Sequence, residues 1–336
     1  MKYFGTDGFR GEANVTLNVE HAYKVGRFLG NYFQKEDHKV RVVIGKDTRR
    51  SSYMFEYALV AGLTASGADV YLLHVTTTPS VSFAVRTEDF DCGIMISASH
   101  NPFYDNGIKL LNGNGQKIEA EIEERIEAYI DGEIEELPLA RKEDIGRTVD
   151  FASGRNRYIG YLISIPSRDF KNVKVGLDCA NGSSSAIAKS VFEALQAKTY
   201  VINNQPDGTN INTNCGSTHI EVLQKFVKEN GLDVEKLFVA VGDPDTRNMI
   251  RQEFGDLPGL HLTSSSSYNL EFNRCDADKG KALRWLCDYL EIPMNQVLAM
   301  GDNENDHTML QTAGITIAPE NASDETKLLV SQVVAA

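Results

Sequence analysis

A serine with basic and amide neighbours follows one of the apolar runs of this sequence. Cys92–Ile96 is typical of a buried strand, and Ser97–Pro102 (SASHNP) and Asp105–Lys109 (DNGIK) come after it. A hydroxyl at a strand end can carry a phosphoryl group, while nearby His, Asn and Lys side chains stabilise the charge on its oxygens. The alternative is a polar turn punctuated by Asn-Pro and Asn-Gly, which composition alone favours.

A second group of residues suited to chemistry lies much later in the sequence. The carboxylates Asp302 and Asp306 and the amide Asn305 follow the predicted strand Val297–Met300. Oxygen ligands of this kind suit a hard cation such as Mg²⁺. The alternative is a solvated helix start, where Asp and Asn are common caps. Lys279, taken alone, is typical of a surface residue.

Strands and helices alternate along nearly the whole chain, which positions both groups at strand ends. This alternation predicts an α/β fold with mostly parallel sheets, in which ligands bind at the carboxyl ends of the strands. We expect Ser51 or Ser52 to cap the helix after the first long strand, and Thr218 with Glu221 to form a capping box. The predicted strands are Val40–Ile44, Val70–Val75, Cys92–Ile96, Val173–Leu177, Thr199–Ile202, Leu237–Val241, Val297–Met300 and Ile315–Ile317, with a strand pair within Leu260–Phe272.

Composition describes an acidic globular protein. The 336 residues allow two or three domains, and the net charge of -13 argues against nucleic acid as a main partner. The five cysteines form no CxxC pair, so neither a disulfide framework nor a zinc site is indicated. No apolar leader or membrane-length apolar run occurs, so we expect a cytoplasmic protein with no membrane partner.

Several motifs in the first two-thirds of the chain resemble the α-D-phosphohexomutases, and the later ones are similar to the phosphoglucosamine branch of that family. The resemblance covers about residues 1–234. Its motifs are Phe4–Gly11 (FGTDGFRG), the serine loop Ser97–Lys109, Asp178–Gly182 (DCANG), Pro206–Asn212 (PDGTNIN) and Asn214–His219 (NCGSTH).

This resemblance implies a phosphoserine enzyme. Such enzymes convert glucosamine 6-phosphate to glucosamine 1-phosphate through a bisphosphate, with Mg²⁺ bound to the phosphoserine. By position, Ser99 is the phosphate carrier and a metal ligand, and Arg10, His100 and Lys109 are its supports. The implied partner is a small sugar phosphate.

From about residue 235 the sequence resembles the last part of a Cof-type haloacid-dehalogenase-like phosphatase. The motifs are Asp278–Leu283 (DKGKAL) and Gly301–Asp306 (GDNEND). The resemblance implies that Lys279 steadies a phosphoryl group and that Asp302, Asn305 and Asp306 bind Mg²⁺. No segment supplies the Asp-x-Asp-x-Thr motif that carries the nucleophile in that family.

The segment at the join offers a further candidate. Strand Leu237–Val241 runs into the sequence GDPDTR, which places Asp243 and Asp245 at its end. We hypothesise that this strand completes the second mutase sheet and that the two aspartates form a partial Mg²⁺ site facing Ser99. The alternative, which we favour because short motifs are weak signals, is a turn in the cap domain of the phosphatase.

The sequence thus predicts three parts: phosphohexomutase domain I at 1–150, a truncated domain II at 151–234, and a partial Rossmann-like haloacid-dehalogenase core at 235–336. We expect a mutase-like phosphotransferase with little or no turnover, because the family's Asp-Gly-Asp-x-Asp-Arg metal loop and its third and fourth domains are missing. A sugar-phosphate phosphatase fragment and a non-catalytic hybrid are the alternatives, so whether the chain is an active enzyme stays open. An incomplete C-terminal sheet would expose a strand edge, which predicts self-association.

Overall fold

The chain divides into two compact units, Met1–Asn230 and Gly231–Ala336. The computed structural model describes residues 2–34, 38–230, 236–240, 243–264 and 269–335. Within these residues, no helix has the length and apolar character needed to cross a bilayer. Each unit is an α/β structure, which confirms the predicted fold class.

The N-terminal unit is built on a seven-stranded mixed sheet in the order β1-β2-β6-β5-β3-β4-β7. Strands β5, β3, β4 and β7 run parallel, whereas β6, β2 and β1 continue the sheet in antiparallel pairs. The strands are β1 (Phe4–Gly5), β2 (Gly8–Glu12), β3 (Arg41–Lys46), β4 (Asp69–Val75), β5 (Cys92–Ile96), β6 (Asp105–Asn112) and β7 (Thr148–Asp150). Strand β5 has the predicted bounds, and its five residues are all buried.

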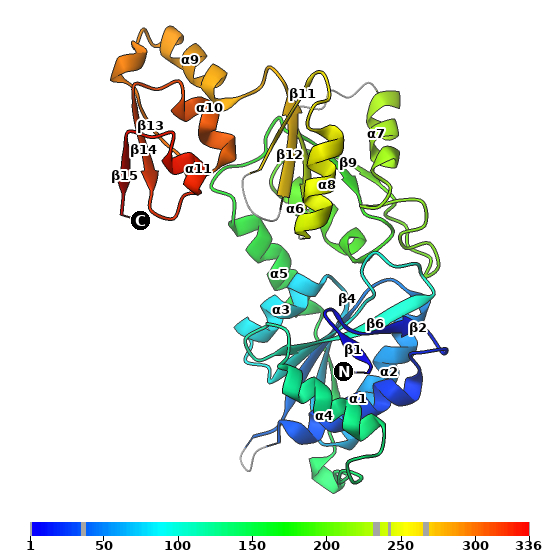
Figure 1. The fold of residues 1–336 in the computed structure, drawn as a ribbon. Coiled ribbons are helices and arrows are strands. Elements are labelled where there is room, and N and C mark those ends of the chain that lie inside the picture. The colour runs from blue at the N-terminus through cyan, green and yellow to red at the C-terminus, as the bar shows by residue number, and fades with distance from the viewer. Residues whose placement is uncertain (1, 35–37, 231–235, 241–242, 265–268, 336) are drawn as a thin grey trace. The chain divides into compact units, whose positions relative to one another are not determined.

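Helices cover both faces of this sheet and enclose two apolar clusters (Figure 1). Helices α1, α2 and α4 pack on one face and α3 on the other. A side chain at Gly62 would place its Cβ 2.2 Å from the Tyr23 carbonyl oxygen, so glycine lets α1 and α2 approach closely. The helices are α1 (Val19–Tyr32), α2 (Arg50–Ala65), α3 (Thr78–Thr87) and α4 (Ala120–Ile130).

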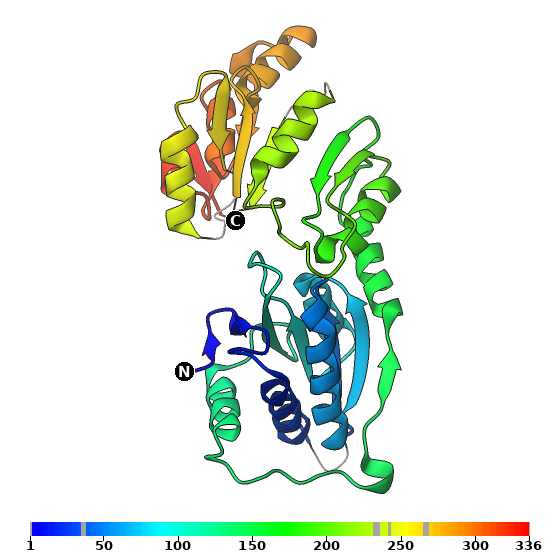
Figure 2. The same cartoon turned by 90° about the vertical axis from the view of Figure 1, so that its right-hand side faces the viewer.

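The segment between α4 and β7 crosses the end of the sheet to its far edge (Figure 2). It is anchored by Arg27 of α1, whose side chain is fully buried and donates to the carbonyl of Pro138 at 3.2 Å. The segment is therefore fastened to the first domain.

The rest of the N-terminal unit, from α5 onward, is a smaller subdomain of two parallel strands with helices, called the second layer below. It comprises α5 (Ala152–Ser164), β8 (Lys174–Asp178), η2 (Ser183–Ala186), α6 (Ala188–Ala194), β9 (Lys198–Ile202) and α7 (Ile220–Glu229). The loops after β8 and β9 contact the first domain, where Thr48 Oγ1 donates to the Asn181 carbonyl at 2.6 Å and the Arg50 amide donates to the Gly208 carbonyl at 2.9 Å.

The C-terminal unit contains two three-stranded sheets, one antiparallel and one parallel. In the parallel sheet, β13 lies at one edge, and its Leu298 and Met300 are exposed. The antiparallel sheet has the order β10-β12-β11 and the parallel one β13-β14-β15. The elements are β10 (Lys236–Ala240), α8 (Pro244–Phe254), β11 (Leu260–Thr263), β12 (Asn269–Arg274), α9 (Lys279–Tyr289), η3 (Met294–Gln296), β13 (Leu298–Met300), η4 (Glu304–Asp306), α10 (His307–Leu310), β14 (Ile315–Pro319), α11 (Asp324–Lys327) and β15 (Gln332–Val334).

The hypothesis that the strand at the join completes the second mutase sheet is wrong. Strand β10 pairs along all five of its residues with β12, antiparallel, and so belongs to the C-terminal unit. The β8–β9 sheet has two strands in the described structure, and β10 is not one of them. Val241 and Gly242, which complete the proposed strand and loop, lie outside the described residues.

Both predicted helix caps are also wrong. Helix α2 already begins at Arg50, and the Ser52 hydroxyl lies inside it, donating to Asp47 at 2.8 Å. Helix α7 begins at Ile220 after His219, so Thr218 makes no cap there.

Candidate functional site

The serine loop joins β5 to β6 at the carboxyl end of the parallel strands. Ser99 is exposed and has a φ of 57°, in the left-handed region that non-glycine residues seldom adopt. Its amide donates to Ser97 Oγ at 3.1 Å, and Asn101 Nδ2 donates to Asp105 at 2.9 Å, so the loop is bonded internally on both sides of Ser99. The predicted support His100 is exposed beside it.

Arg10 and Lys109 lie on the same face of the sheet next to this loop. Arg10 is opposite Gly107 in the β2–β6 pair, and Lys109 is two residues further along β6. A Cβ on Gly107 would lie 2.8 Å from the Ser97 carbonyl oxygen and 3.1 Å from Arg10 Cγ, so glycine lets the arginine stem and the serine loop meet. The structure thus places Arg10 and Lys109 next to the loop that carries Ser99, and their role as supports of Ser99 stays a prediction.

Both cations keep donor capacity at this site. Arg10 Nη2 pairs with Asp7 at 2.7 Å, while its Nε is buried and has no hydrogen-bond partner among the described residues. Burial lowers the pKa of Lys109, and the nearby Arg10 guanidinium lowers it further. Two partly desolvated cations with unused donors are suited to an anionic group such as a phosphate.

The serine loop rests on a buried ion pair that the sequence analysis missed. Arg49, at the carboxyl end of β3, is fully buried and pairs with Asp47. Its guanidinium also donates to the carbonyls of Asn101 at 2.6 Å and Ser99 at 3.2 Å. The signal in the sequence was the charged pair directly after a buried strand adjacent to β5.

The second layer also reaches the serine loop. Asn212 Nδ2 donates to the Ser99 carbonyl at 2.9 Å and to the Asn101 carbonyl at 3.0 Å. Asp178, which follows β8, accepts from the amides of Ala180 and Gly216, both at 2.9 Å. Its carboxylate therefore organises its own loop.

In the C-terminal unit, three of the four predicted residues come together. Lys279, at the start of α9, pairs with the buried Asp306, and Asp306 also accepts from the Asp302 amide at 3.2 Å. Asn305 lies in the same turn, η4. A glycine at 301 is required here, because its Cβ would lie 2.4 Å from that of Asp306.

Of the two aspartates at the join, Asp243 has a structural role. Asp243 is exposed and is the N-cap of α8, where its carboxylate accepts from the Thr246 hydroxyl at 2.5 Å and from the Thr246 amide at 2.8 Å. These bonds lower the pKa of Asp243. Asp245 is exposed in the first turn of the same helix.

No group of three or more His, Cys, Asp or Glu side chains arranged to hold a metal occurs in the described part of the chain. Among the described residues, those around Ser99 form no such cluster for Mg²⁺, and the acidic turn offers Asp302, Asn305 and Asp306 as the predicted oxygen ligands.

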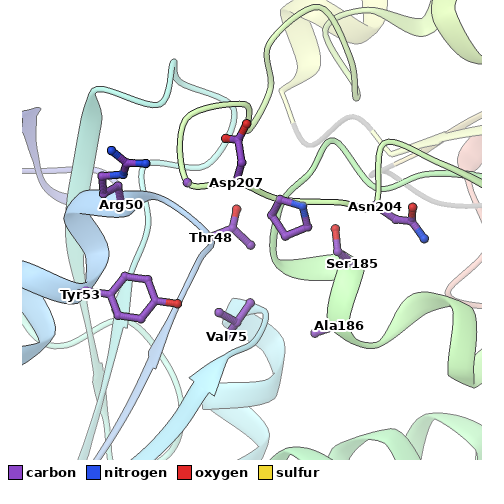
Figure 3. A pocket seen from close by; sticks show the side chains of 10 residues that line it. Thr48, Arg50, Tyr53, Val75, Ser185, Ala186, Asn204 and Asp207 are labelled. Carbon is purple, nitrogen blue, oxygen red and sulfur yellow. The ribbon is translucent and has the colours of Figure 1, made fainter.

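A separate cavity of about 460 Å³ lies where β3 and β4 end (Figure 3). The chain leaves β3 for α2 and β4 for α3, on opposite faces of the sheet, a switch of direction at which α/β folds often bind ligands. None of its lining residues belongs to the serine loop. They are Thr48, Arg50, Tyr53, Val75, Ser185, Ala186, Asn204, Pro206, Asp207 and Gly208.

Comparison with known families divides the chain in the same sense as its motifs. Residues 1–136 match the sequence model for phosphoglucomutase/phosphomannomutase, alpha/beta/alpha domain I. Residues 172–336 match the model for haloacid dehalogenase-like hydrolases. The chain joins a phosphohexomutase part to a haloacid dehalogenase-like part. We refer to the unit Met1–Asn230 as the mutase part and to Gly231–Ala336 as the hydrolase part.

Curated relatives of the mutase part are phosphoglucosamine mutases. The one from Lachnoclostridium phytofermentans is 72% identical over 244 residues, which is 73% of this chain and 54% of that protein. The one from Lachnospira eligens is 64% identical over 263 residues, 78% of this chain and 58% of that protein. This chain therefore spans little more than half the length of these relatives.

Solved structures agree in fold with the mutase assignment. A phosphoglucomutase/phosphomannomutase family protein from Burkholderia thailandensis matches with a TM-score of 0.59 at 24% identity, over 71% of this chain and 52% of that one. A putative phosphomannomutase from Thermus thermophilus matches with a TM-score of 0.52 at 22% identity, over 94% and 69%.

The hydrolase match begins at residue 172, upstream of the predicted join near residue 235. Together with the mutase-like stretch of 244 residues it exceeds the length of the chain, so the two similarities overlap. The contacts of the fold nevertheless separate after Asn230. The boundaries 1–150, 151–234 and 235–336 stay predictions.

Proposed function

We propose that the mutase part accepts a phosphoryl group on Ser99 from a hexosamine bisphosphate, the first half of phosphoglucosamine mutase chemistry. The observation that carries this proposal is the exposed Ser99 in a loop bonded to Arg49, with Arg10 and Lys109 on the strands next to that loop. The 72% identity to a phosphoglucosamine mutase supports the choice of an amino sugar as substrate class.

The chemistry of the step is a direct displacement at phosphorus. Ser99 Oγ forms a bond to the phosphorus, the bond from phosphorus to the sugar oxygen breaks, and the hydroxyl proton of Ser99 ends on the departing sugar oxygen. Arg10 Nε and the Lys109 ammonium would donate to the phosphoryl oxygens, where charge is spread during transfer. His100, exposed next to Ser99, would contact the substrate.

Complete mutase turnover is proposed to be low or absent. Phosphoryl transfer depends on positioning and on metal electrostatics. The described residues around Ser99 supply no carboxylate cluster for Mg²⁺, and the strand expected before the metal loop pairs with β12 instead. Asp243, as a helix cap, is an unsuitable substitute ligand.

A second proposal concerns the hydrolase part. The pairing of Lys279 with Asp306, and of Asp306 with the Asp302 amide, favours a site for Mg²⁺ and a phosphate group, with Asn305 as a further oxygen ligand. We propose binding without hydrolysis, because the nucleophile motif is missing from the sequence.

The experiment for the first proposal combines label transfer and turnover. The full chain is incubated with Mg²⁺ and glucosamine 1,6-bisphosphate labelled in phosphate, and isomerisation of glucosamine 6-phosphate is followed in a coupled assay. We expect label on the protein, none on Ser99→Ala, and little isomerisation. Label on Ser99→Ala equal to that on the unchanged chain would refute Ser99 as the acceptor, and rapid isomerisation would refute the loss of turnover.

A further inference from the structure

We propose that Asn212 is a positioning residue for Ser99, acting from the second layer of the mutase part on the backbone of the serine loop. This inference rests on the proposed function for its catalytic consequence. The geometric part, that Asn212 holds the loop, stands on hydrogen bonds alone and is testable without any reaction.

Two side chains donate hydrogen bonds to the same two carbonyl oxygens of the loop. Asn212 Nδ2 donates to Ser99 O and Asn101 O at 2.9 and 3.0 Å, and Arg49 Nη2 donates to the same oxygens at 3.2 and 2.6 Å. Arg49 lies between β3 and α2 of the first domain, whereas Asn212 follows β9 of the second layer. The loop is thus fixed by both layers of the unit.

The loop needs such support because of its backbone conformation. Ser99 has a φ of 57°, and serine pays an energetic cost in the left-handed region, which surrounding bonds must offset. Ser99 is exposed, so few packing contacts can hold it. Donors to its carbonyl and to that of Asn101 fix the Ser99–His100 and Asn101–Pro102 peptide planes, and hence the direction of the Ser99 hydroxyl.

The residue type at 212 matches this task. Both partners are carbonyl oxygens, so only a donor such as an amide nitrogen can bond to both. Asn212 itself has a φ of 59°, and asparagine tolerates this conformation better than most residues. Its own amide donates to the Ala180 carbonyl at 2.9 Å, which fastens the backbone of residue 212 to the loop after β8.

The chain offers a matched control two residues away. Asn214 also has a left-handed backbone, with a φ of 50°, but it is exposed and its side chain bonds to nothing in the described structure. Asn212→Gly and Asn214→Gly therefore remove the same side chain from the same kind of backbone. Asn212→Asp keeps the shape of the side chain, but it replaces the donor by a carboxylate oxygen and adds a negative charge facing the two carbonyls.

The first measurement is hydrogen exchange of the serine-loop peptides in the full chain without substrate. We expect faster exchange at residues 97–106 in Asn212→Gly and Asn212→Asp, and the wild-type rate in Asn214→Gly, with equal melting temperatures. Equal loop exchange in all four proteins would overturn the inference. If Asn212→Gly alone loses protection throughout the unit, the exchange of the serine-loop peptides in Asn212→Asp decides, because the isosteric side chain preserves the packing.

The second measurement is the rate of phosphoryl transfer to Ser99 at saturating glucosamine 1,6-bisphosphate. Loss of the two bonds should slow transfer about tenfold in both Asn212 variants, with the half-saturating bisphosphate concentration unchanged. A rise in that concentration at an unchanged maximal rate would assign Asn212 to substrate binding and overturn the positioning role. Absence of label in every protein, with faster loop exchange in the Asn212 variants, would refute the proposed function and leave the loop contact standing.

Discussion

Replacing Asp47 by asparagine tests the account of how the serine loop is supported. Arg49 is fully buried and Asp47 is its only carboxylate partner in the described structure. Asp47 also accepts from the Arg49 amide at 3.0 Å and from the Ser52 hydroxyl at 2.8 Å. In Asp47→Asn the guanidinium keeps the loop carbonyls but loses its counter-charge in a site shielded from water.

The cost follows from the burial of the pair. Breaking a buried ion pair by removing one partner typically costs about 3–5 kcal/mol, since an uncompensated charge remains. The matched control is Glu193→Gln, which removes the carboxylate of the half-exposed pair Lys189–Glu193, whose charges are 3.7 Å apart. Exposed pairs of this kind contribute at most about 1 kcal/mol.

The assay is urea unfolding followed by circular dichroism, with tryptophan fluorescence recorded alongside. Trp285, the single tryptophan of the chain, lies in the hydrolase part, so its signal separates the two units. We expect the transition of the mutase part to move to lower urea in Asp47→Asn with an unchanged slope, and the Trp285 transition to stay in place. A loss in Asp47→Asn no larger than that in Glu193→Gln would refute the reasoning.

Three further predictions concern charge. Burial and Arg10 lower the pKa of Lys109 from its ordinary value of 10.5, so phosphoryl transfer should decline with rising pH. In a pH–rate profile, Lys109→Arg should shift that decline to higher pH. Identical profiles would contradict the role of Lys109. Burial raises the pKa of Glu127, but the three backbone N–H donors to its carboxylate outweigh this effect, and the net pKa is lowered. The stabilisation by the Glu127 carboxylate is therefore present above the ordinary pKa of 4.5 and is lost as the pH falls through the lowered pKa. Glu127→Gln should therefore destabilise the mutase part by about 1–3 kcal/mol in urea at neutral pH, with the difference from wild type shrinking in acid; a pH-independent difference would contradict this. Asp306→Asn should weaken Mg²⁺ binding at least about tenfold in isothermal titration calorimetry, whereas the exposed Asp324→Asn should not; equal affinities would exclude the acidic turn as the site.

The strands could be predicted from the sequence because their signal is local. Cys92–Ile96 is a continuous apolar run, and the observed β5 has the same bounds and full burial. The helix starts could not, because a capping residue has competing tertiary partners. Ser52 bonds to Asp47 and lies inside α2, and His219 rather than Thr218 precedes α7. Helix α1 was not among the predicted elements, although Asn18 and His21 form a capping box at its start.

The pairing of β10 shows a different limit. Its apolar sequence correctly predicted a strand, but a strand's sequence does not name its partner. The five-residue register with β12 depends on partners that lie 29 to 37 positions later in the chain. Position after β9 suggested the mutase sheet, and tertiary pairing decided otherwise.

The sequence points to the reactive residues of the candidate site but not to their supports. Ser99, Arg10 and Lys109 belong to short motifs, and their joint role stays a prediction. Arg49 and Asn212 act on backbone carbonyls of a loop at least fifty positions away, and nothing in the sequence names that loop as their partner. Only the fold reveals which donors reach the Ser99 carbonyl.

Peptide mapping tests most directly whether Ser99 receives the phosphoryl group. The full chain is incubated with Mg²⁺ and glucosamine 1,6-bisphosphate, digested, and analysed by tandem mass spectrometry, with far-ultraviolet circular dichroism confirming that it is folded. We expect one phosphoryl group on Ser99 and none on Ser97 in the same peptide. A folded chain with no phosphate on Ser99, or with phosphate on Ser97 instead, would contradict it.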